Sequence, residues 1–170
     1  MLFRSVRFVE DNKTLLNNRP QCFHHGDYHV GNFLLADNGR LSLIDWEPLD
    51  YDNDADPWEE FNRIGNSDVM SHFATGLIRG YFKEDPPAAF WQLLKFYLSA
   101  GALMLVSWAV HVQPDQLDYA TRHVQDLLSW YDQMRSDVPS WYLSDFYIQY
   151  TDQVPDRKST RLNSSHRIRS

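Results

Sequence analysis

The sequence predicts an α+β fold in which a short β-hairpin is followed by a mainly helical bundle. Two apolar runs, residues 33–36 and 41–44, are separated by residues 37–40, which contain Asn38-Gly39. Asn-Gly between apolar runs is a strong hairpin signal, because both residues accept a positive φ. In the back half of the chain, apolar residues recur at the three-to-four spacing of helices that pack on a core. We therefore expect strands first and helices behind them.

The individual elements follow from local signals along the chain. Residues 21–24 form a further short strand candidate. Asp56 begins a helix, because it can cap the first turn, Pro57 suits that turn and Glu59 can complete a capping box. Three more helices are expected, at about 68–81, from Pro86-Pro87 to about 112, and from about 115 to 135 after a break at Pro114. The third of these four helices is apolar nearly all round, so we expect it to be the core helix.

Composition limits the class of protein. The chain has 170 residues, 43% of them apolar, which is enough for one domain with a core. Its net charge of -7 disfavours nucleic acid and anionic membranes as partners. The most apolar run, residues 96–110, is short for a membrane span and indicates a buried helix. The single cysteine, Cys22, excludes an internal disulfide and a cysteine-based zinc site, and it fits the reducing cytoplasm.

The last 15 residues differ from the rest of the chain. Residues 156–170 hold five basic residues against one acid, and no core face can be drawn through them. Residues 156–166 resemble a sequencing adapter translated in one frame. We therefore expect residues 1–155 to form one lobe, and residues 156–170 to be a disordered, non-native tail.

The chemically informative residues lie before and after the hairpin. Asp27 and Asn32 are five residues apart in the stretch HGDYHVGN, residues 25–32, and Asp45 follows Asn32 by thirteen residues. Phosphoryl transfer needs an acid near the attacking hydroxyl and oxygen ligands for Mg²⁺ on the phosphates. The hairpin makes the thirteen-residue gap short in space, so the spacing predicts one pocket that contains all three side chains.

These two motifs, HGD with Asn32 and then Ile44-Asp45-Trp46, resemble the catalytic and metal loops of aminoglycoside phosphotransferases and the related choline-kinase-like enzymes. The stretch DPWEEFNR, residues 56–63, is also similar to the segment that follows the metal loop in bacterial members. The resemblance covers residues 1–155 and is specific because both spacings match together. It implies a small-molecule kinase that uses ATP and Mg²⁺, with the fold of the C-terminal lobe of a protein kinase.

Site roles are carried over one position at a time. Asp27 matches the catalytic base, while Asn32 and Asp45 match ligands of Mg²⁺. His25 matches a position that supports the loop structurally. Protein kinases have Arg where Gly26 stands and Gly where Glu47 stands, so the small-molecule branch fits better. The segment between Asp45 and residue 56 is a few residues longer than in relatives, which leaves the roles of Asp50, Asp52 and Asp54 open.

The nucleotide-binding half of a kinase is not recognisable in this chain. No G-x-G-x-x-G loop occurs, and only 24 residues precede His25, whereas such a lobe needs on the order of a hundred residues. We therefore expect a fragment that is the C-terminal lobe of a phosphotransferase and is inactive as an isolated chain. The substrate would be a small molecule with a hydroxyl group, such as an aminoglycoside-like compound or an amino alcohol.

Other interpretations of the same residues remain open. Residues 41–60 contain eight acids and no base, which is either a solvated acidic loop or a cradle for a cationic substrate. His29 either lines the site or lies on the surface. The stretch Gly26-Asp27-Tyr28-His29 also matches one element of metallophosphoesterases, although the further elements of that class do not occur. A third interpretation is a non-catalytic fragment or binding module.

Overall fold

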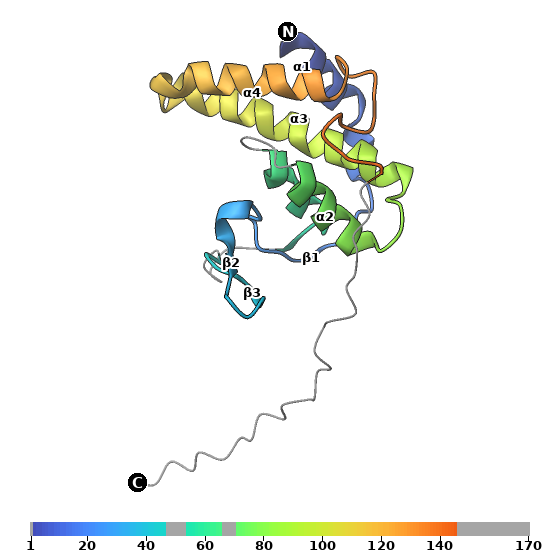
Figure 1. The fold of residues 1–170 in the computed structure, drawn as a ribbon. Helices are drawn as coiled ribbons and strands as arrows, with labels where there is room; N and C mark the ends of the chain where they lie inside the picture. The colour runs from blue at the N-terminus through green and yellow to red at the C-terminus, as the bar shows by residue number, and fades with distance from the viewer. Residues whose placement is uncertain (1, 47–53, 66–70, 146–170) are drawn as a thin grey trace, which may run out of the picture.

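The computed structural model describes residues 2–46, 54–65 and 71–145 (Figure 1). Their elements, in chain order, are α1 (Leu2–Asp11), η1 (Lys13–Leu16), β1 (Cys22–Phe23), η2 (Val30–Asn32), β2 (Phe33–Leu35), β3 (Leu41–Leu43), β4 (Asp54–Ala55), η3 (Glu59–Gly65), α2 (Ser71–Phe82), α3 (Ala88–His111), η4 (Pro114–Gln116) and α4 (Leu117–Trp130), where η denotes a 3₁₀ helix. This is a mixed α+β fold, mostly helical with small two-stranded sheets, as the sequence predicts.

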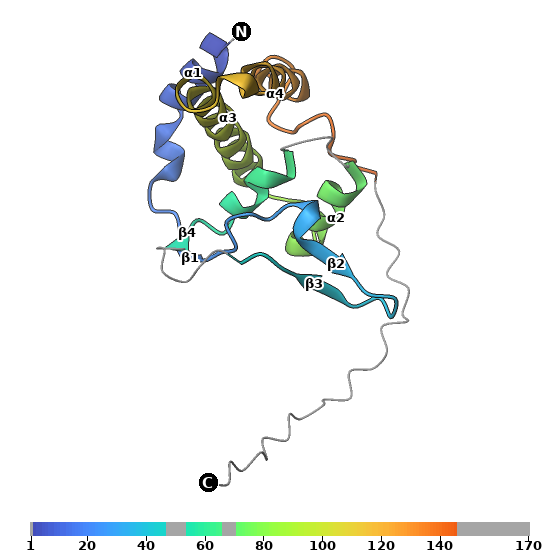
Figure 2. The same cartoon turned by 90° about the vertical axis from the view of Figure 1, so that its left-hand side faces the viewer.

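The helix α3 is the centre of the core. Its first half is buried nearly all round, and α1 and α4 lie along either side of it (Figure 2). The main apolar cluster joins Phe90 and Leu94 of α3 to Leu127 of α4, Ile78 of α2 and Phe61 of η3. The expected core helix is confirmed. By length and composition alone α3 is also long and apolar enough to cross a membrane, and half of its most apolar window is buried inside the protein.

The N-terminal helix α1 was not among the predicted elements. Phe8 and Val9, together with Leu15 of the following turn, pack on a small cluster of Leu93, Phe96 and Tyr97 from α3. Leu2, Val6 and Val9 recur at the three-to-four spacing of an amphipathic helix, so the local signal for α1 is present in the sequence and was overlooked. Packing on α3 then buries one face of this helix.

The hairpin is confirmed, with a different turn from the one that Asn-Gly suggests. Strand β2 pairs with β3 in the register Phe33 with Leu43 and Leu35 with Leu41. Only Gly39 has a positive φ, +77°, and the N–H of Gly39 donates to the carbonyl of Ala36 at 2.8 Å. The connection is therefore a three-residue loop that ends in a left-handed glycine, in place of a two-residue turn with two left-handed residues.

The strand predicted at residues 21–24 is present as β1, and its partner is β4, which the sequence did not reveal. Cys22 lies opposite Ala55 and Phe23 lies opposite residue 54 in antiparallel register. This pairing brings the chain that follows the acidic segment back beside the chain that precedes the catalytic loop. Glu47, Asp50 and Asp52 of that segment lie outside the described residues, as does the tail at 156–170.

The helices differ from the predictions mainly at their ends. Asp56 caps its helix as expected, through a 3.0 Å bond from the Trp58 N–H to Oδ1, but the helix that follows is the 3₁₀ helix η3. The expected start of the second helix near residue 68 lies outside the described residues. The fourth helix ends at Trp130 rather than at residue 135, because Asp132, Gln133 and Met134 all have positive φ. The buried Lys95 amine stabilises that turn by donating to the Met134 carbonyl at 2.9 Å.

Candidate functional site

The loop between β1 and β2 is arranged by His25, which is 2% exposed. Its Nε2 lies 2.8 Å from the carbonyl oxygen of Ile44, and its Nδ1 accepts the Asp27 N–H at 3.3 Å. A neutral ring with its proton on Nε2 satisfies both contacts. One side chain thus joins the loop that carries Asp27 to the end of β3, immediately before Asp45.

Asn32 forms the second connection between the same two segments. Its carbonyl accepts the Ile44 N–H at 3.0 Å, while its side-chain Nδ2 donates to the carbonyl of Asp27 at 2.8 Å and to Asp27 Oδ2 at 3.2 Å. The residue is 6% exposed. Among the described residues, no hydrogen bond reaches the side-chain Oδ1 of Asn32, so that oxygen is available as a ligand.

Asp45 follows directly on these contacts. Its backbone has a φ of +60°, in the left-handed region that asparagine and aspartate tolerate better than most residues. Its side chain is exposed, and no ion pair or hydrogen bond within the described residues involves it. The two hydrogen bonds of Ile44 place the backbone of Asp45 beside Asn32 and His25, which brings the three predicted site segments together.

The carboxylate of Asp27 has two basic neighbours. His29 Nε2 lies 3.3 Å from Oδ2, and Arg63 Nε of η3 lies 3.7 Å from Oδ1. About one third of the Asp27 side chain is exposed. His29, whose role the sequence left open, therefore contacts the site. Arg63 belongs to the resembling segment 56–63, and its contact with Asp27 arises because η3 packs against the loop.

A second residue of η3 that sequence reasoning missed is Glu60. One of its carboxylate oxygens accepts the backbone N–H of His25, and the other accepts that of Gly26 at 3.4 Å. Gly26 has a φ of +82°, so the loop turns sharply at this point. The same carboxylate lies 3.6 Å from His24 Nδ1. Glu60 of η3 therefore fixes the backbone of the loop at His25 and Gly26.

An ion pair between Arg19 and the buried Asp56 connects the segment before β1 to the start of η3. Arg19 binds both carboxylate oxygens of Asp56, at 2.5 and 3.0 Å, and stacks over Trp58 at 4.2 Å. The hydroxyl of Tyr97 from α3 donates to Asp56 Oδ2 at 2.7 Å. Asp56 is 3% exposed. This carboxylate is therefore both a helix cap and the point at which the segment before β1, η3 and α3 meet.

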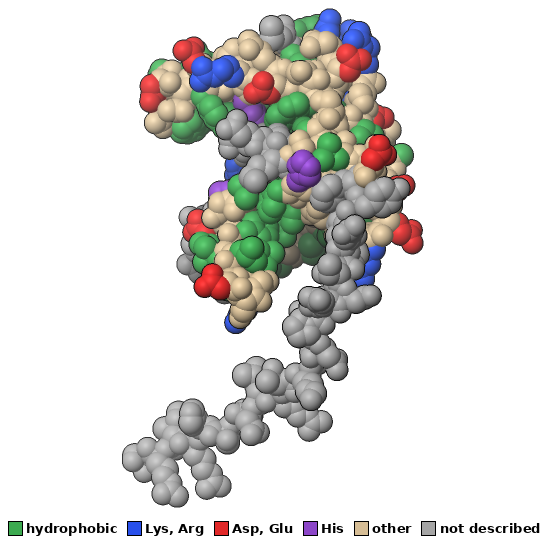
Figure 3. Space-filling view, in the orientation of Figure 1, with side chains coloured by type: hydrophobic (Ala, Val, Ile, Leu, Met, Phe, Trp, Pro, Cys, Tyr) green, Lys and Arg blue, Asp and Glu red, His purple; other side chains and the backbone are tan. Residues whose placement is uncertain are grey.

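A cleft of about 650 Å³ opens beside the loop. Figure 3 shows the surface hollowed on this side, between the α3–α4 helices and the region of the hairpin. Its polar lining includes His24, Glu59, Arg63 and His123, and its aromatic lining is Tyr97, Trp108 and Tyr119. Asp27 is not itself a lining residue, but Gly26 beside it and Arg63 in contact with it are.

Glu59 of η3 faces this cleft instead of completing the expected capping box. No hydrogen bond of its side chain occurs among the described residues. Burial raises its pKa, the charge of His24 opposes that shift, and Asp56 and Glu60 add to it. A half-buried carboxylate with carboxylate neighbours favours a cationic partner.

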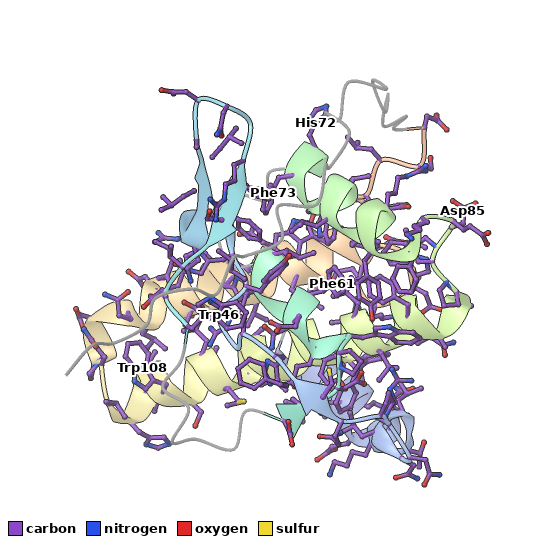
Figure 4. The ribbon with its side chains drawn as sticks, turned by 90° about the horizontal axis from the view of Figure 1, so that it is seen from below. Trp46, Phe61, His72, Phe73, Asp85 and Trp108 are labelled. Atoms are coloured by element: carbon purple, nitrogen blue, oxygen red, sulfur yellow. The ribbon has the colours of Figure 1, made fainter. Side chains whose placement is uncertain are left out.

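A second cavity, of about 400 Å³, lies between η3 and α2. Its lining is mainly apolar and includes Tyr28, Phe61 and Leu77. Figure 4 shows Phe73 of α2 reaching toward the hairpin, where its ring lies 5.3 Å from that of Phe33. Trp108, labelled in the same view, lies well away from this contact on α3. Both cavities are lined by residues of η3: the larger one by Glu59 and Arg63, the smaller one by Glu60 and Phe61.

The comparisons with known proteins identify the class. The sequence model of the phosphotransferase enzyme family, APH, matches residues 7–91, half of the chain. The chain therefore belongs to this family, which implies a kinase-like fold, and the resemblance seen in its two motifs is confirmed. No curated protein and no solved structure was found to match the chain.

A metal site made only of protein side chains needs at least three ligands close together, and the described residues do not provide such a group. In the described parts of the chain, no three His, Cys, Asp or Glu residues lie close enough to hold an ion together. Mg²⁺ in phosphoryl-transfer sites usually takes one or two carboxylates and completes its shell with phosphates and water. The carbonyl oxygen of Asn32 and the carboxylate of Asp45 are hard oxygen donors, so this donor set fits Mg²⁺.

Proposed function

We propose that the protein transfers the γ-phosphoryl group of ATP to a hydroxyl group of a small molecule. The observation that supports this most is the double connection through Ile44, which holds Asp27, Asn32 and the segment of Asp45 in one place. The phosphotransferase family match agrees with it. The alternative of a metallophosphoesterase has no such support beyond the contact of Asp27 with His29.

In this proposal Asp27 is the catalytic base. Its carboxylate orients the hydroxyl of the acceptor and takes the proton as the oxygen attacks phosphorus. The amide of Asn32 holds one carboxylate oxygen, and Arg63 lies beside the other. Because its side-chain Nδ2 donates to Asp27, Asn32 would offer its side-chain carbonyl oxygen to a bound Mg²⁺, and Asp45 would offer its carboxylate. When Mg²⁺ is bound with ATP, it neutralises the charge of the transferring phosphate.

The acceptor is proposed to bind in the 650 Å³ cleft, which has the volume of an ordinary small-molecule site. Glu59 supplies a carboxylate there, and Trp108 supplies an aromatic face for an ammonium group. We therefore expect an acceptor with a basic amine. We further propose that the partner is a small molecule and that the protein binds neither nucleic acid nor membranes. We also propose a cytoplasmic location, and no turnover without a nucleotide-binding lobe.

The test is transfer of the labelled γ-phosphate of ATP to amino alcohols and amino sugars, with the full open reading frame that contains this chain. Asp27→Asn keeps the size of the side chain and removes its basicity, so we expect turnover to fall by about 10²–10⁴-fold. Nucleotide binding should be nearly unchanged in this variant. Near-normal turnover of Asp27→Asn would show that the role given to Asp27 is wrong. Exposed Asp37 of the hairpin loop, changed to Asn, is the matched control.

A further inference from the structure

The 400 Å³ cavity between η3 and α2 has no part in the proposed reaction. Its walls include Tyr28 of the catalytic loop, Glu60 and Phe61 of η3, and Gly76 and Gly80 of α2. Protein interiors are normally close-packed, with few voids larger than a water molecule. An apolar cavity of about 150 Å³ is enough to bind benzene. The space beside α2 is therefore large enough for an aromatic compound of two fused rings.

The wall formed by α2 is unusually flat. Gly76 and Gly80 lie one helical turn apart, and a Cβ built at either of them would meet no atom within 4 Å. Close packing in the described structure therefore does not require glycine at these positions, although glycine destabilises a helix relative to alanine. Two aromatic rings, of Phe61 and Tyr81, meet edge to face beside this wall at 5.4 Å. A flat ring is thus the shape that fits against the helix backbone here.

Glu60 and Tyr28 give the same cavity a polar side. The carboxylate of Glu60 accepts the backbone N–H of His25 with one oxygen and that of Gly26 with the other, at 3.4 Å. Burial raises the pKa of Tyr28, and the negative charge of Glu60 adds to this rise, so the two groups lie close together. An ionised carboxylate has about four acceptor positions, so Glu60 can accept a further donor from the cavity. The bond to Gly26 is already long and is the one that such a donor would weaken.

We infer that this cavity is a regulatory site for a two-ring aromatic compound with an N–H donor. The rings lie against Gly76 and Gly80, and the N–H donates to Glu60. Glu60 then holds Gly26 less firmly, which displaces the adjacent Asp27 and slows phosphoryl transfer. Among the described residues, none lines both this cavity and the 650 Å³ cleft, so the occupant does not compete with the acceptor. The effect on transfer rests on the proposed function, whereas the binding does not.

The experiment measures binding to the full chain of 170 residues. Indole is the probe, and benzofuran, which has the same shape with an oxygen in place of the N–H, is its matched control compound. NMR titrations follow the backbone amides of His25, Gly26 and Tyr28. We expect indole to bind about tenfold tighter than benzofuran, the difference that one hydrogen bond to a charged group gives. The amide proton of Gly26 should move upfield with indole, because its bond to Glu60 lengthens.

Three variants locate the binding site. Gly76→Leu fills the cavity and suits a helix, so it should lose at least about tenfold in affinity for both probes without loss of stability. Gly101→Leu makes the same change on α3, at an equally open position that lines the cleft, and should bind both probes as the wild type does. Glu60→Gln keeps one acceptor for the loop and removes the charge, so it should lose about tenfold for indole and little for benzofuran.

The outcomes separate this inference from the proposed function. Unchanged binding in Gly76→Leu, loss of binding in Gly101→Leu, or equal affinity of the two probes would overturn the inference. With the full open reading frame, indole should lower kcat by about tenfold, because a displaced base slows transfer, and should leave KM for the acceptor unchanged. Competition of indole with the acceptor, or an unchanged kcat, would overturn the regulatory role. Binding of indole as described, without any phosphoryl transfer, would overturn the proposed function alone.

Discussion

The carboxylate of Asp56 shows how one residue in this protein serves several elements. Burial alone would raise its pKa, but the bonds from Arg19, from the Trp58 N–H and from Tyr97, together with the charge of Arg19, hold the pKa below its ordinary value. The same bond raises the pKa of Arg19. The ionised pair is thus favoured in the folded state. A sequence can show that Asp56 caps a helix, but it does not show that a residue 37 positions earlier binds it.

The Asp56 pair predicts a defined pH dependence of stability. Because the folded pKa is lowered, the stabilisation is complete above the unfolded pKa, about 3.9, and is lost as pH falls through the folded value. At pH 7 we expect Asp56→Asn to lower the free energy of unfolding by about 1.5–3 kcal/mol. The gap between variant and wild type should close in acid.

Urea unfolding at a series of pH values measures this. Asp54→Asn, the same change at an exposed carboxylate of β4, is the control and should follow the wild type throughout. A gap between Asp56→Asn and wild type that stays constant down to pH 3, or widens there, would contradict the ionised pair.

At the scale of elements, the hairpin and the long helices follow from local sequence signals. The sequence predictions are wrong at turns, short strands and helix ends, where tertiary contacts determine the structure. The turn at residues 37–39 has its left-handed position at Gly39 alone. The pairing of β1 with β4 involves two residues on each side, too few for a period-two pattern to show. The early end of α4 depends on Lys95, which lies 39 positions away from the carbonyl that it binds. Such long-range contacts leave no signal in a local sequence window.

Substitution by alanine should change the free energy of unfolding in opposite directions at two glycines. Gly39 has a φ of +77° and open space where a Cβ would lie, so Gly39→Ala should lower the free energy of unfolding by about 1–2 kcal/mol through backbone strain alone. Gly76 lies inside α2 with equally open space, so Gly76→Ala should raise that free energy by about 0.5–1 kcal/mol. Urea midpoints measure both, and Gly39→Asn should be milder than Gly39→Ala because asparagine tolerates this conformation. The same sign for both alanine variants would contradict the turn described here.

At the scale of the whole molecule, the candidate site contains two kinds of residue. The sequence predicts the segments that carry Asp27, Asn32 and Asp45, but it does not predict the residues that contact and hold these segments. The spacing of Asp27, Asn32 and Asp45 identified the loops, because a family motif keeps chemistry at fixed intervals. Arg63, Glu60 and the cleft residue His123 were missed as site residues. They come from helices that reach the site only through packing on α3, and an isolated Glu, Arg or His on a helix is indistinguishable from a surface residue. The family match covers residues 7–91 and does not reach α4.

The central claim is that Asn32 and Asp45 form one divalent-ion site beside Asp27, and Mn²⁺ tests it without any need for turnover. Mn²⁺ takes the same oxygen ligands as Mg²⁺ and broadens NMR signals of nearby nuclei. When Mn²⁺ and ATP are added to the full chain, we predict that the amide signals of Asp27, Asn32 and Asp45 broaden first and together. Asp45→Asn keeps a residue that tolerates positive φ and removes the charge, so it should abolish this broadening without unfolding the protein. Identical broadening in wild type and Asp45→Asn, or broadening centred away from these three amides, would contradict the claim.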